Sequence, residues 1–454
     1  MATATNEKPF SVAIVGAGIG GLSLAIGLLK QKVPCTIYEG AARFDIIGAG
    51  IGMGPNALRA IELMDPKFAR LYDEIKVGNT SADRVHEQFE ILGAEEGFGI
   101  TDAWQGGRVS HPDFTRSSAH RHDLLRVMRS LIPEGTVQFN RRVAKLSNGP
   151  GSKASIEFES GDIVEADIVI GCDGIKGLSR SAVLAGRWPE EVLPKYNHSY
   201  VYRGIASMED AKKRIGSYAE DARWWMSPRK GWTMYPISKG REVNIVAFMY
   251  DEDEWKGPPA ATEVPREEML AEFKEFDHRL QGMLDFVKPV KWPLYHHPDT
   301  PSYYNSRLCL LGDSAHASSP SQAAGAGQGL EDALLLSRLL GLVKAPQELD
   351  AAIQAYDAIR RPRAQGVVRQ SRDVGRAYYL IDPEFGTDLQ RITDEANQRL
   401  PQIWWHDLDA DCGRAGEMFR ALSQTALDSS AGSPRKVERT TKHSQGQQIR
   451  ALLA

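Results

Sequence analysis

The stretch from Ser11 to Lys30, near the start of the chain, is mostly apolar and carries no charge before its last residue. By hydropathy alone this run has the character of a membrane span. Its glycines favour another interpretation, because the first of them stand where a strand would end rather than at the spacing of helix packing. We therefore predict a strand over 12–15, a turn, and a helix that begins at about Ile19.

The turn carries the spacing Gly16-x-Gly18-x-x-Gly21, which is typical of dinucleotide-binding folds. Gly16 permits a tight turn, Gly18 lets a pyrophosphate approach the backbone, and Gly21 lets the helix pack closely on the strand, while the helix N-terminus faces the anion. A second short strand, CTIYE, ends in Glu39, where an acidic residue binds ribose hydroxyls. A buried helical hairpin or a membrane anchor would leave Glu39 unexplained, so the pattern predicts a nucleotide site.

The hydrophobic pattern changes twice further along the chain. A continuous apolar run that ends at Asp173-Gly174 predicts a buried parallel strand. From about Pro189 to Pro293, alternating aromatic and polar segments predict the strands of a mainly antiparallel sheet. The nucleotide-type pattern then returns with a strand that ends at Asp313, a loop rich in small residues, and an amphipathic helix. One domain thus interrupts another.

The predicted fold class is α/β: a Rossmann-like nucleotide-binding domain, interrupted by a mainly antiparallel substrate domain and followed by C-terminal helices. The predicted boundaries place the nucleotide-binding domain at 8–75, 106–188 and 294–380, the substrate domain at 76–105 and 189–293, the C-terminal helices at 381–422, and a flexible tail without apolar periodicity at 423–454.

Composition excludes several classes of protein. A chain of 454 residues exceeds the usual size of a single core, and its 42% hydrophobic content is that of a globular protein. The net charge of −4, without a block of Lys or Arg, gives no reason to expect a nucleic-acid partner. Four scattered cysteines without a Cys-x-x-Cys pair, and a start without a basic signal-peptide region, favour a cytoplasmic protein without a membrane span. His120 and His122 are two apart on a predicted helix, so no metal site is expected.

Three motifs in order carry a resemblance: the glycine fingerprint with Glu39, the segment IVIGCDGIKGLSR, and the segment LCLLGDSAHASSPSQAAGAGQGLEDA. Together they resemble the single-component FAD-dependent aromatic hydroxylases, the group A flavoprotein monooxygenases that include salicylate hydroxylase and para-hydroxybenzoate hydroxylase. The similarity covers about 10–375. The segments VYRGIASMEDA, YPISKGREVNIVAF and RRPRA look most like fungal salicylate-hydroxylase-type enzymes and the related phenol-dearomatising monooxygenases of polyketide pathways.

The resemblance implies FAD as cofactor, with NADH or NADPH as a transient co-substrate that has no second glycine fingerprint of its own. The matching FAD contacts are Gly16, Gly18, Gly21, Glu39, Gly52, Arg121, Asp313 and Ala326. Asp313 would bind hydroxyls of the ribityl chain. The loop 325–329 opens a helix whose positive N-terminal end would stabilise the negative charge of reduced flavin.

The resemblance further implies that the enzyme hydroxylates a phenolic ring with NAD(P)H and O2 through a flavin hydroperoxide. A phenol with a pKa near 10 must be deprotonated or polarised, and a fixed cation does this directly. The matching catalytic residues are Arg203 and Tyr235, and an arginine there would grip a carboxylate equally well. The alternatives to these catalytic roles are that Arg203 forms a structural ion pair and that Tyr235 is an ordinary buried residue of the sheet. Trp224 and Trp225 point to opposite faces of a strand, so at most one lines the pocket.

Several alternatives stay open on sequence alone. The substrate is a salicylate-like acid or, alternatively, a polyketide phenol dearomatised in fungal secondary metabolism. A flavin halogenase is disfavoured because its Trp-x-Trp-x-Ile-Pro signature is absent. A non-enzymatic nucleotide-binding protein is disfavoured because the motifs at the flavin end are retained. The expected partners are a small phenol and O2, with a homodimer possible, and His316 is expected to fix its loop rather than to catalyse.

Overall fold

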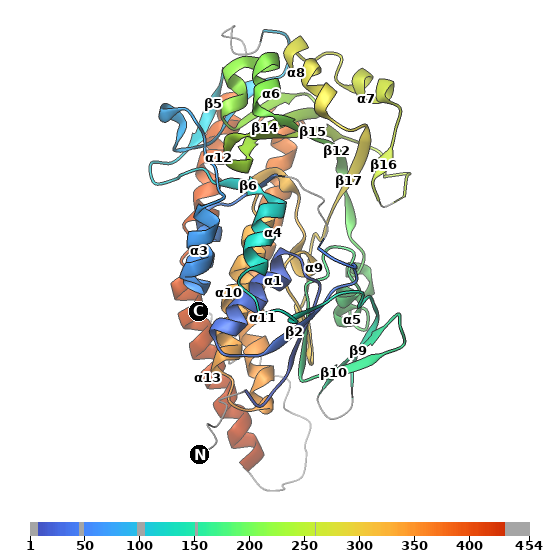
Figure 1. The fold of residues 1–454 in the computed structure, drawn as a ribbon, viewed down its shortest axis with the longest axis vertical. Helices are drawn as coiled ribbons and strands as arrows, with labels where there is room; N and C mark the ends of the chain where they lie inside the picture. The colour runs from blue at the N-terminus through green and yellow to red at the C-terminus, as the bar shows by residue number, and fades with distance from the viewer. Residues whose placement is uncertain (1–7, 45–49, 98–104, 150–152, 259, 432–454) are drawn as a thin grey trace.

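The computed structural model describes residues 8–44, 50–97, 105–149, 153–258 and 260–431. Two sheets lie at opposite ends of the molecule, one containing β2 and the other containing β12, β14 and β15 (Figure 1). The long helices α11 (Leu349–Tyr378) and α13 (Leu408–Ala431) run along the long axis of the molecule. None of the helices in these described ranges is long and apolar enough to cross a membrane.

A six-stranded sheet forms the nucleotide-binding half, in the order β18-β19-β11-β1-β2-β7. Its central strands pair in parallel, and every residue of β1 and β11 is buried, as the continuous apolar runs predicted. Helix α1 follows β1 directly and packs against α10, so the predicted strand, turn and helix are confirmed. The strands are β1 Val12–Val15, β2 Cys35–Tyr38, β7 Val137–Gln138, β11 Ile168–Gly171, β18 Tyr304–Asn305 and β19 Leu308–Leu310.

An eight-stranded sheet forms the other half, in the order β16-β17-β12-β15-β14-β13-β4-β5. Its pairs are antiparallel except for β4 with β13, which run parallel. The predicted mainly antiparallel sheet is therefore confirmed. Its strands are β4 Glu87–Gly93, β5 Gln105–Ser110, β12 Lys195–Ser207, β13 Arg223–Ser227, β14 Lys230–Ile237, β15 Glu242–Tyr250, β16 Thr262–Glu263 and β17 Val290–His296.

Two smaller sheets and the remaining helices complete the described fold. Strand β3 (Gly50–Gly52) pairs with β6 (Ser118–His120), and β8 (Val143–Asn148), β9 (Ala154–Phe158) and β10 (Ile163–Ala166) form the other sheet. The helices are α1 Ile19–Lys30, α2 Pro55–Met64, α3 Pro66–Asp73, α4 Arg121–Arg129, α5 Leu178–Leu184, α6 Met208–Ile215, α7 Arg266–Glu272, α8 His278–Met283, α9 Asp313–His316, α10 Gly325–Leu342 and α12 Leu389–Trp404.

Three predicted boundaries fall inside elements. The division at 105/106 lies within β5 and that at 293/294 within β17, because these strands belong to the eight-stranded sheet along their whole length. Helix α13 continues to Ala431, past residue 423, where the sequence predicted a tail. The segment 423–431 contains no Gly or Pro that would end a helix. Residues 432–454 of the predicted tail lie outside the described residues.

A buried ion network ties α10 to α11. The Arg360 guanidinium donates from Nε to Asp332 Oδ1 at 2.8 Å and from Nη1 to Glu331 Oε2 at 2.6 Å. Asp332 also accepts a hydrogen bond from the Gly312 amide at 3.0 Å and pairs with His316 Nε2 at 2.5 Å. Burial by itself raises the pKa of Asp332, but His316 and Arg360 outweigh burial and lower this pKa to about 2. The network therefore fixes the turn between β19 and α9 and the start of α10 relative to α11.

Substituting Arg360→Met will lower the free energy of unfolding by about 3–5 kcal/mol, because two buried carboxylates lose the arginine that they share, although Asp332 keeps His316 and Glu331 keeps Arg363. Arg361→Met is the matched control on the same helix. Arg361 pairs with Asp357, which keeps a hydrogen bond from the Tyr303 amide at 2.8 Å, so its loss will cost less than about 1 kcal/mol. Urea denaturation measures the free energy of unfolding of both variants. Equal losses in Arg360→Met and Arg361→Met would contradict the structural role assigned to the Arg360 network.

Candidate active site

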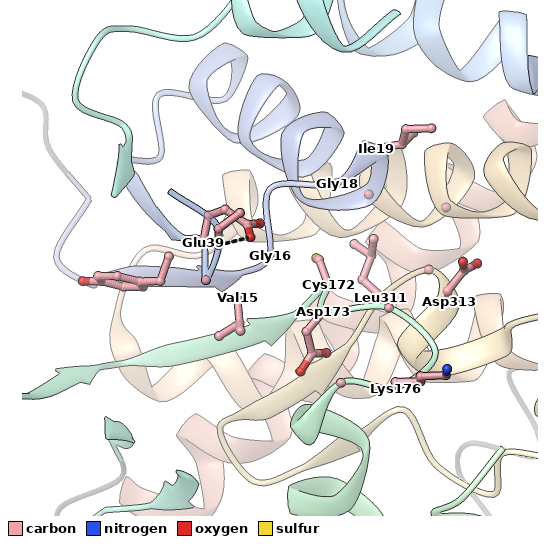
Figure 2. Close-up of a pocket in the computed structure, with 18 of the residues that line it drawn as sticks. Val15, Gly16, Gly18, Ile19, Glu39, Cys172, Asp173, Lys176, Leu311 and Asp313 are labelled. Carbon is pink, nitrogen blue, oxygen red and sulfur yellow. Dashed lines mark hydrogen bonds between the residues drawn. The ribbon is translucent and has the colours of Figure 1, made fainter. Parts of the chain in front are cut away.

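A cavity of about 860 Å³ opens at the carboxyl ends of β1, β2, β11 and β19. We call it the nucleotide groove. Figure 2 shows Glu39, Asp173 and Asp313 arranged around this one space, with Gly16 and Gly18 in the turn that follows Val15. The carboxyl edge of a parallel sheet is where open α/β folds bind their ligands.

The three fingerprint glycines have different environments. A Cβ at Gly16, whose φ is +100°, would lie 2.5 Å from the Cys172 carbonyl oxygen, and a Cβ at Gly21 would lie 2.0 Å from the Gly16 carbonyl oxygen. A Cβ at Gly18 would meet no described atom within 4 Å. Packing therefore requires glycine at the first and third positions. Gly18 instead opens into the groove as the N-cap residue of α1, where it offers no side chain to cap the first turn.

Two acidic side chains are held in place around the groove. Glu39 accepts hydrogen bonds from the amides of Ala17 and Ala41, each at 2.8 Å. Asp173 accepts from the Ser179 amide and hydroxyl through Oδ2, each at 2.9 Å, while its buried Oδ1 has no partner among the described residues. Burial raises the pKa of Asp173. Both carboxylates have positions fixed by the protein, and Asp173 retains an acceptor for a hydroxyl donor.

A second cavity, of about 420 Å³, adjoins the nucleotide groove. We call it the aromatic cavity. The two cavities share Ile51, Asp313, Gly325 and Ala326, so they adjoin each other, and their junction lies at the start of α10. Burial raises the pKa of Asp313, and the charges of His316 and Arg121 oppose that rise. The N-cap residue of α10, Ala324, makes no side-chain hydrogen bond to its first turn, whose amides carry the positive end of the helix dipole at this junction.

Strand alternation builds the walls of the aromatic cavity. Trp224 of β13 lines the cavity with Phe89 and Phe248, whereas the next residue, Trp225, lies in the core on the other face of the sheet, beneath α6 and α8. The prediction that at most one of the two tryptophans lines the pocket is thus confirmed. The cavity accordingly has flat aromatic walls that fit a planar ring.

Arg203 and Tyr235 both point into the aromatic cavity. Arg203 on β12 stands opposite Val246 of β15, and Tyr235 on β14 stands opposite Asn244 of β15, two residues away on the same face. No described carboxylate forms an ion pair with Arg203, whose guanidinium carbon lies 5.3 Å from the centroid of the Trp292 ring. Burial raises the pKa of Tyr235 to about 12, so its hydroxyl stays protonated.

The structure divides the expected site residues between the two cavities. Gly16, Gly18, Glu39, Arg121, Asp313 and Ala326 line the nucleotide groove, and Arg203 and Tyr235 line the aromatic cavity. Gly21 lies beneath the turn and does not line the groove, and Gly52 lines the aromatic cavity instead of the groove. His316 is buried on Asp332, which matches the expected role in fixing its loop.

Sequence reasoning missed Arg116, which also lines the aromatic cavity. It lies in the loop between β5 and β6, where no motif or periodicity singles it out. The position depends on tertiary contacts: β6 pairs with β3, and the Ser118 hydroxyl donates to the Pro236 carbonyl oxygen of β14 at 3.0 Å. Gly50 of β3, within the glycine-rich stretch of the sequence, also lines this cavity, and a Cβ there would lie 2.6 Å from the Tyr235 ring.

The residues around the groove fit FAD. The open space at Gly18 and the uncapped start of α1 suit a pyrophosphate, and the free acceptor of Asp173 suits a hydroxyl donor. The rest of a long cofactor would then extend to the junction, where its ring end meets the aromatic cavity. Fold and site together define an oxidoreductase that brings a dinucleotide redox cofactor against an aromatic substrate.

Comparison with known proteins agrees with this class. The model of the FAD binding domain family matches residues 9–371. An FAD-dependent monooxygenase of Gibberella moniliformis is 40% identical over 436 residues, covering 92% of this chain and 98% of its own. The 6-methylsalicylate 1-monooxygenase atA of Aspergillus terreus is 34% identical, covering 91% and 93%. A solved salicylate hydroxylase substrate complex superposes with a TM-score of 0.78 at 29% identity, covering 90% of this chain and 98% of the other.

The chain therefore belongs to the FAD binding domain family, and it is an FAD-dependent monooxygenase. The predicted fold class and the predicted cofactor are both confirmed.

Substituting Gly18→Ala will leave the thermal stability of the apoprotein unchanged, because the new methyl group meets no protein atom, but it will weaken FAD binding more than about tenfold, since the methyl occupies ligand space. Gly21→Ala is the matched comparison. Its methyl group collides with the Gly16 carbonyl, so the apoprotein itself will melt at a lower temperature. Melting curves of both apoproteins measure the change in stability, and FAD titrations measure the change in affinity. A Gly18→Ala variant that keeps full FAD affinity would contradict the assignment of the groove as the FAD site.

Proposed function

We propose that this enzyme hydroxylates a phenolic ring, with NADH or NADPH as reductant and O2 as the source of the oxygen atom. One observation carries the proposal: the nucleotide groove adjoins a cavity that has aromatic walls, a guanidinium with no carboxylate partner among the described residues, and a tyrosine whose raised pKa keeps it protonated. The names of the relatives support it, because one is a 6-methylsalicylate monooxygenase and another a salicylate hydroxylase.

Arg203 activates the ring in this proposal. A phenol with a pKa near 10 is mostly neutral at pH 7, and a nearby cation lowers that pKa by stabilising the phenolate. Burial lowers the pKa of Arg203 itself, but an arginine stays protonated at neutral pH. Arg203 is exposed at the cavity and has no carboxylate partner among the described residues, so its charge is available to the phenolic oxygen. An electron-rich phenolate is the form of the ring that accepts an electrophilic oxygen atom.

Tyr235 holds the same phenolic oxygen by donating a hydrogen bond. Its pKa, raised by burial to about 12, keeps the hydroxyl protonated throughout the neutral range, so it does not compete with the substrate for the positive charge of Arg203. Gly50 packs directly on the Tyr235 ring, and the Gly50 amide donates to Asn244 Oδ1 at 2.7 Å. These contacts fix the position of the tyrosine ring in the wall of the cavity.

FAD, when bound, supplies the redox chemistry, accepting a hydride from the reduced coenzyme and activating O2. The protein contributes the environment of the junction. The first turn of α10 places backbone dipoles where negative charge accumulates on a reduced ring system, and the aromatic side chains of the aromatic cavity pack against the planar ring of the substrate.

Two outcomes of the oxygen transfer fit this geometry. Hydroxylation of a salicylate-like acid is the first, and hydroxylating dearomatisation of a polyketide phenol is the second. The 40% identical fungal monooxygenase and the fungal 6-methylsalicylate monooxygenase are compatible with a place in fungal secondary metabolism. The mass of the product and the release of CO2 separate the two outcomes.

Arg203→Ala will retain bound FAD but lose coupled hydroxylation, with a fall of about 10–100-fold in kcat/KM for the phenol, because the phenolate loses a charged hydrogen-bond donor. Tyr235→Phe removes only the hydroxyl and will lower kcat/KM by about 3–10-fold. The measurement is NAD(P)H oxidation alongside product formation with ¹⁸O2.

Arg214→Ala is the matched control, because Arg214 pairs with Asp285 at 2.8 Å on the outer side of the sheet, away from both cavities. That variant will keep normal turnover. Unchanged turnover in Arg203→Ala would remove Arg203 from the reaction.

A further inference from the structure

Asn244 is a buried amide on the face of β15 that lines the aromatic cavity. Its surface is only 3% exposed, and it lines the cavity together with Val246 and Phe248 of the same strand. Asparagine is depleted in strands, and burying an amide costs free energy unless its polar atoms are paired. Val246 and Phe248 are both apolar, so packing on this face does not account for an asparagine. A polar role has to account for it.

The hydrogen bond of Asn244 leads to β3. Asn244 Oδ1 accepts a hydrogen bond from the Gly50 amide at 2.7 Å. Because a backbone N–H can only donate, the side-chain oxygen faces β3 and the NH2 group faces away from it. A Cβ at Gly50 would lie 2.6 Å from the Tyr235 ring and 2.8 Å from Asn244 Cβ, so β3 packs closely against both side chains. The bond therefore fixes how β3 lies on the eight-stranded sheet.

Strand β3 forms part of the wall where the two cavities adjoin. Gly50, Ile51 and Gly52 all line the aromatic cavity, and Ile51 also lines the nucleotide groove. Strand β3 pairs with β6 in a two-stranded sheet, and a sheet of this size is marginally stable by itself. The position of β3 beside Tyr235 consequently depends on bonds that tie the small sheet to the hairpin of β14 and β15.

A second bond of the same kind offers a comparison. The Ser118 hydroxyl of β6 donates to the Pro236 carbonyl oxygen of β14 at 3.0 Å. Ser118 stands opposite Gly52 in the small sheet, but it lines neither cavity. Both bonds join the small sheet to the same hairpin, whereas the Asn244 bond lies at the cavity wall. Loss of the two bonds therefore separates an effect on the reaction from an effect on stability.

We propose that Asn244 is a positioning residue that holds β3 against Tyr235 and so keeps the junction of the two cavities closed to water during oxygen transfer. This inference rests on the proposed function and adds a residue to it. In the coupled reaction, NAD(P)H supplies two electrons, one oxygen atom of O2 enters the ring, and the other leaves as water. When water reaches the junction first, the same two electrons and two protons convert O2 to H2O2, and the ring is unchanged.

The first test is Asn244→Leu, which keeps a side chain of similar size but removes the acceptor. NAD(P)H consumption, hydroxylated product and H2O2 are measured on the FAD-loaded enzyme with a phenol that it hydroxylates. Product formed per NAD(P)H will fall by about 3–10-fold, because one hydrogen bond no longer holds β3, and H2O2 will account for the difference. Asn244→Ala serves the same purpose if the leucine variant folds poorly.

Hydrogen exchange gives a readout that does not depend on turnover. The Gly50 amide loses its acceptor in Asn244→Leu, so its exchange in the FAD-loaded protein will be about tenfold faster or more. Mass spectrometry of the peptide that contains Gly50 measures this rate.

Two further variants separate a positioning role from a structural one. Asn244→Asp keeps an acceptor for the Gly50 amide, so it will recover most of the coupled fraction, although its added negative charge will raise the KM of the phenol. Ser118→Ala is the matched control. It will lower the melting temperature as Asn244→Leu does, but it will keep the native ratio of product to NAD(P)H.

The proposal is overturned if Asn244→Leu keeps the native coupled fraction, if Ser118→Ala uncouples the enzyme as strongly, or if Asn244→Asp couples as poorly as Asn244→Leu. Failure of the proposed function gives a different result, because the native enzyme would then hydroxylate no phenol. Failure of this inference leaves phenol hydroxylation by the native enzyme intact. The two failures are therefore distinguishable in the same set of measurements.

Discussion

The buried ion network of Arg360, Glu331 and Asp332 is the interaction on which the site depends. It joins α10 to α11, and through Asp332 it also holds the Gly312 amide and His316. These bonds set the position of Asp313 and the first turn of α10, which form the junction of the two cavities. Arg363 also pairs with Glu331 at 3.2 Å, so two arginines balance the two carboxylates, and the network fixes geometry without adding an unbalanced field beside the cofactor.

The eight-stranded sheet separates packing from chemistry by strand alternation. One set of alternate residues, including Tyr202, Ile245 and Trp225, packs beneath the outer helices, and the other set, including Arg203 and Trp224, faces the aromatic cavity. The polar groups on the inner face are consequently held by a rigid element rather than by loops. Arg203, which has no carboxylate partner among the described residues, is therefore held by a strand where a ligand in the cavity can reach it.

Local motifs explain what could be predicted from sequence. Gly16, Gly18 and Glu39 lie within one strand-helix-strand unit, so their spacing alone predicts their shared groove. Arg203 and Tyr235 were predicted only by resemblance, because nothing in their own strands says which face meets a ligand. Other parts of the site could be recognised only from the tertiary structure. The loop of Arg116 has no pattern of its own, and the pairing of β4 with β13 joins segments far apart in the chain.

The central claim is that FAD and the aromatic substrate meet at the junction of the two cavities. Titrating the FAD-loaded protein with a hydroxybenzoate, while recording the flavin absorption spectrum, tests this claim most directly. The account predicts a saturable spectral change whose midpoint equals the dissociation constant from calorimetry, because the ligand replaces water against the flavin ring. Tight binding by calorimetry that leaves the flavin spectrum unchanged would contradict the account.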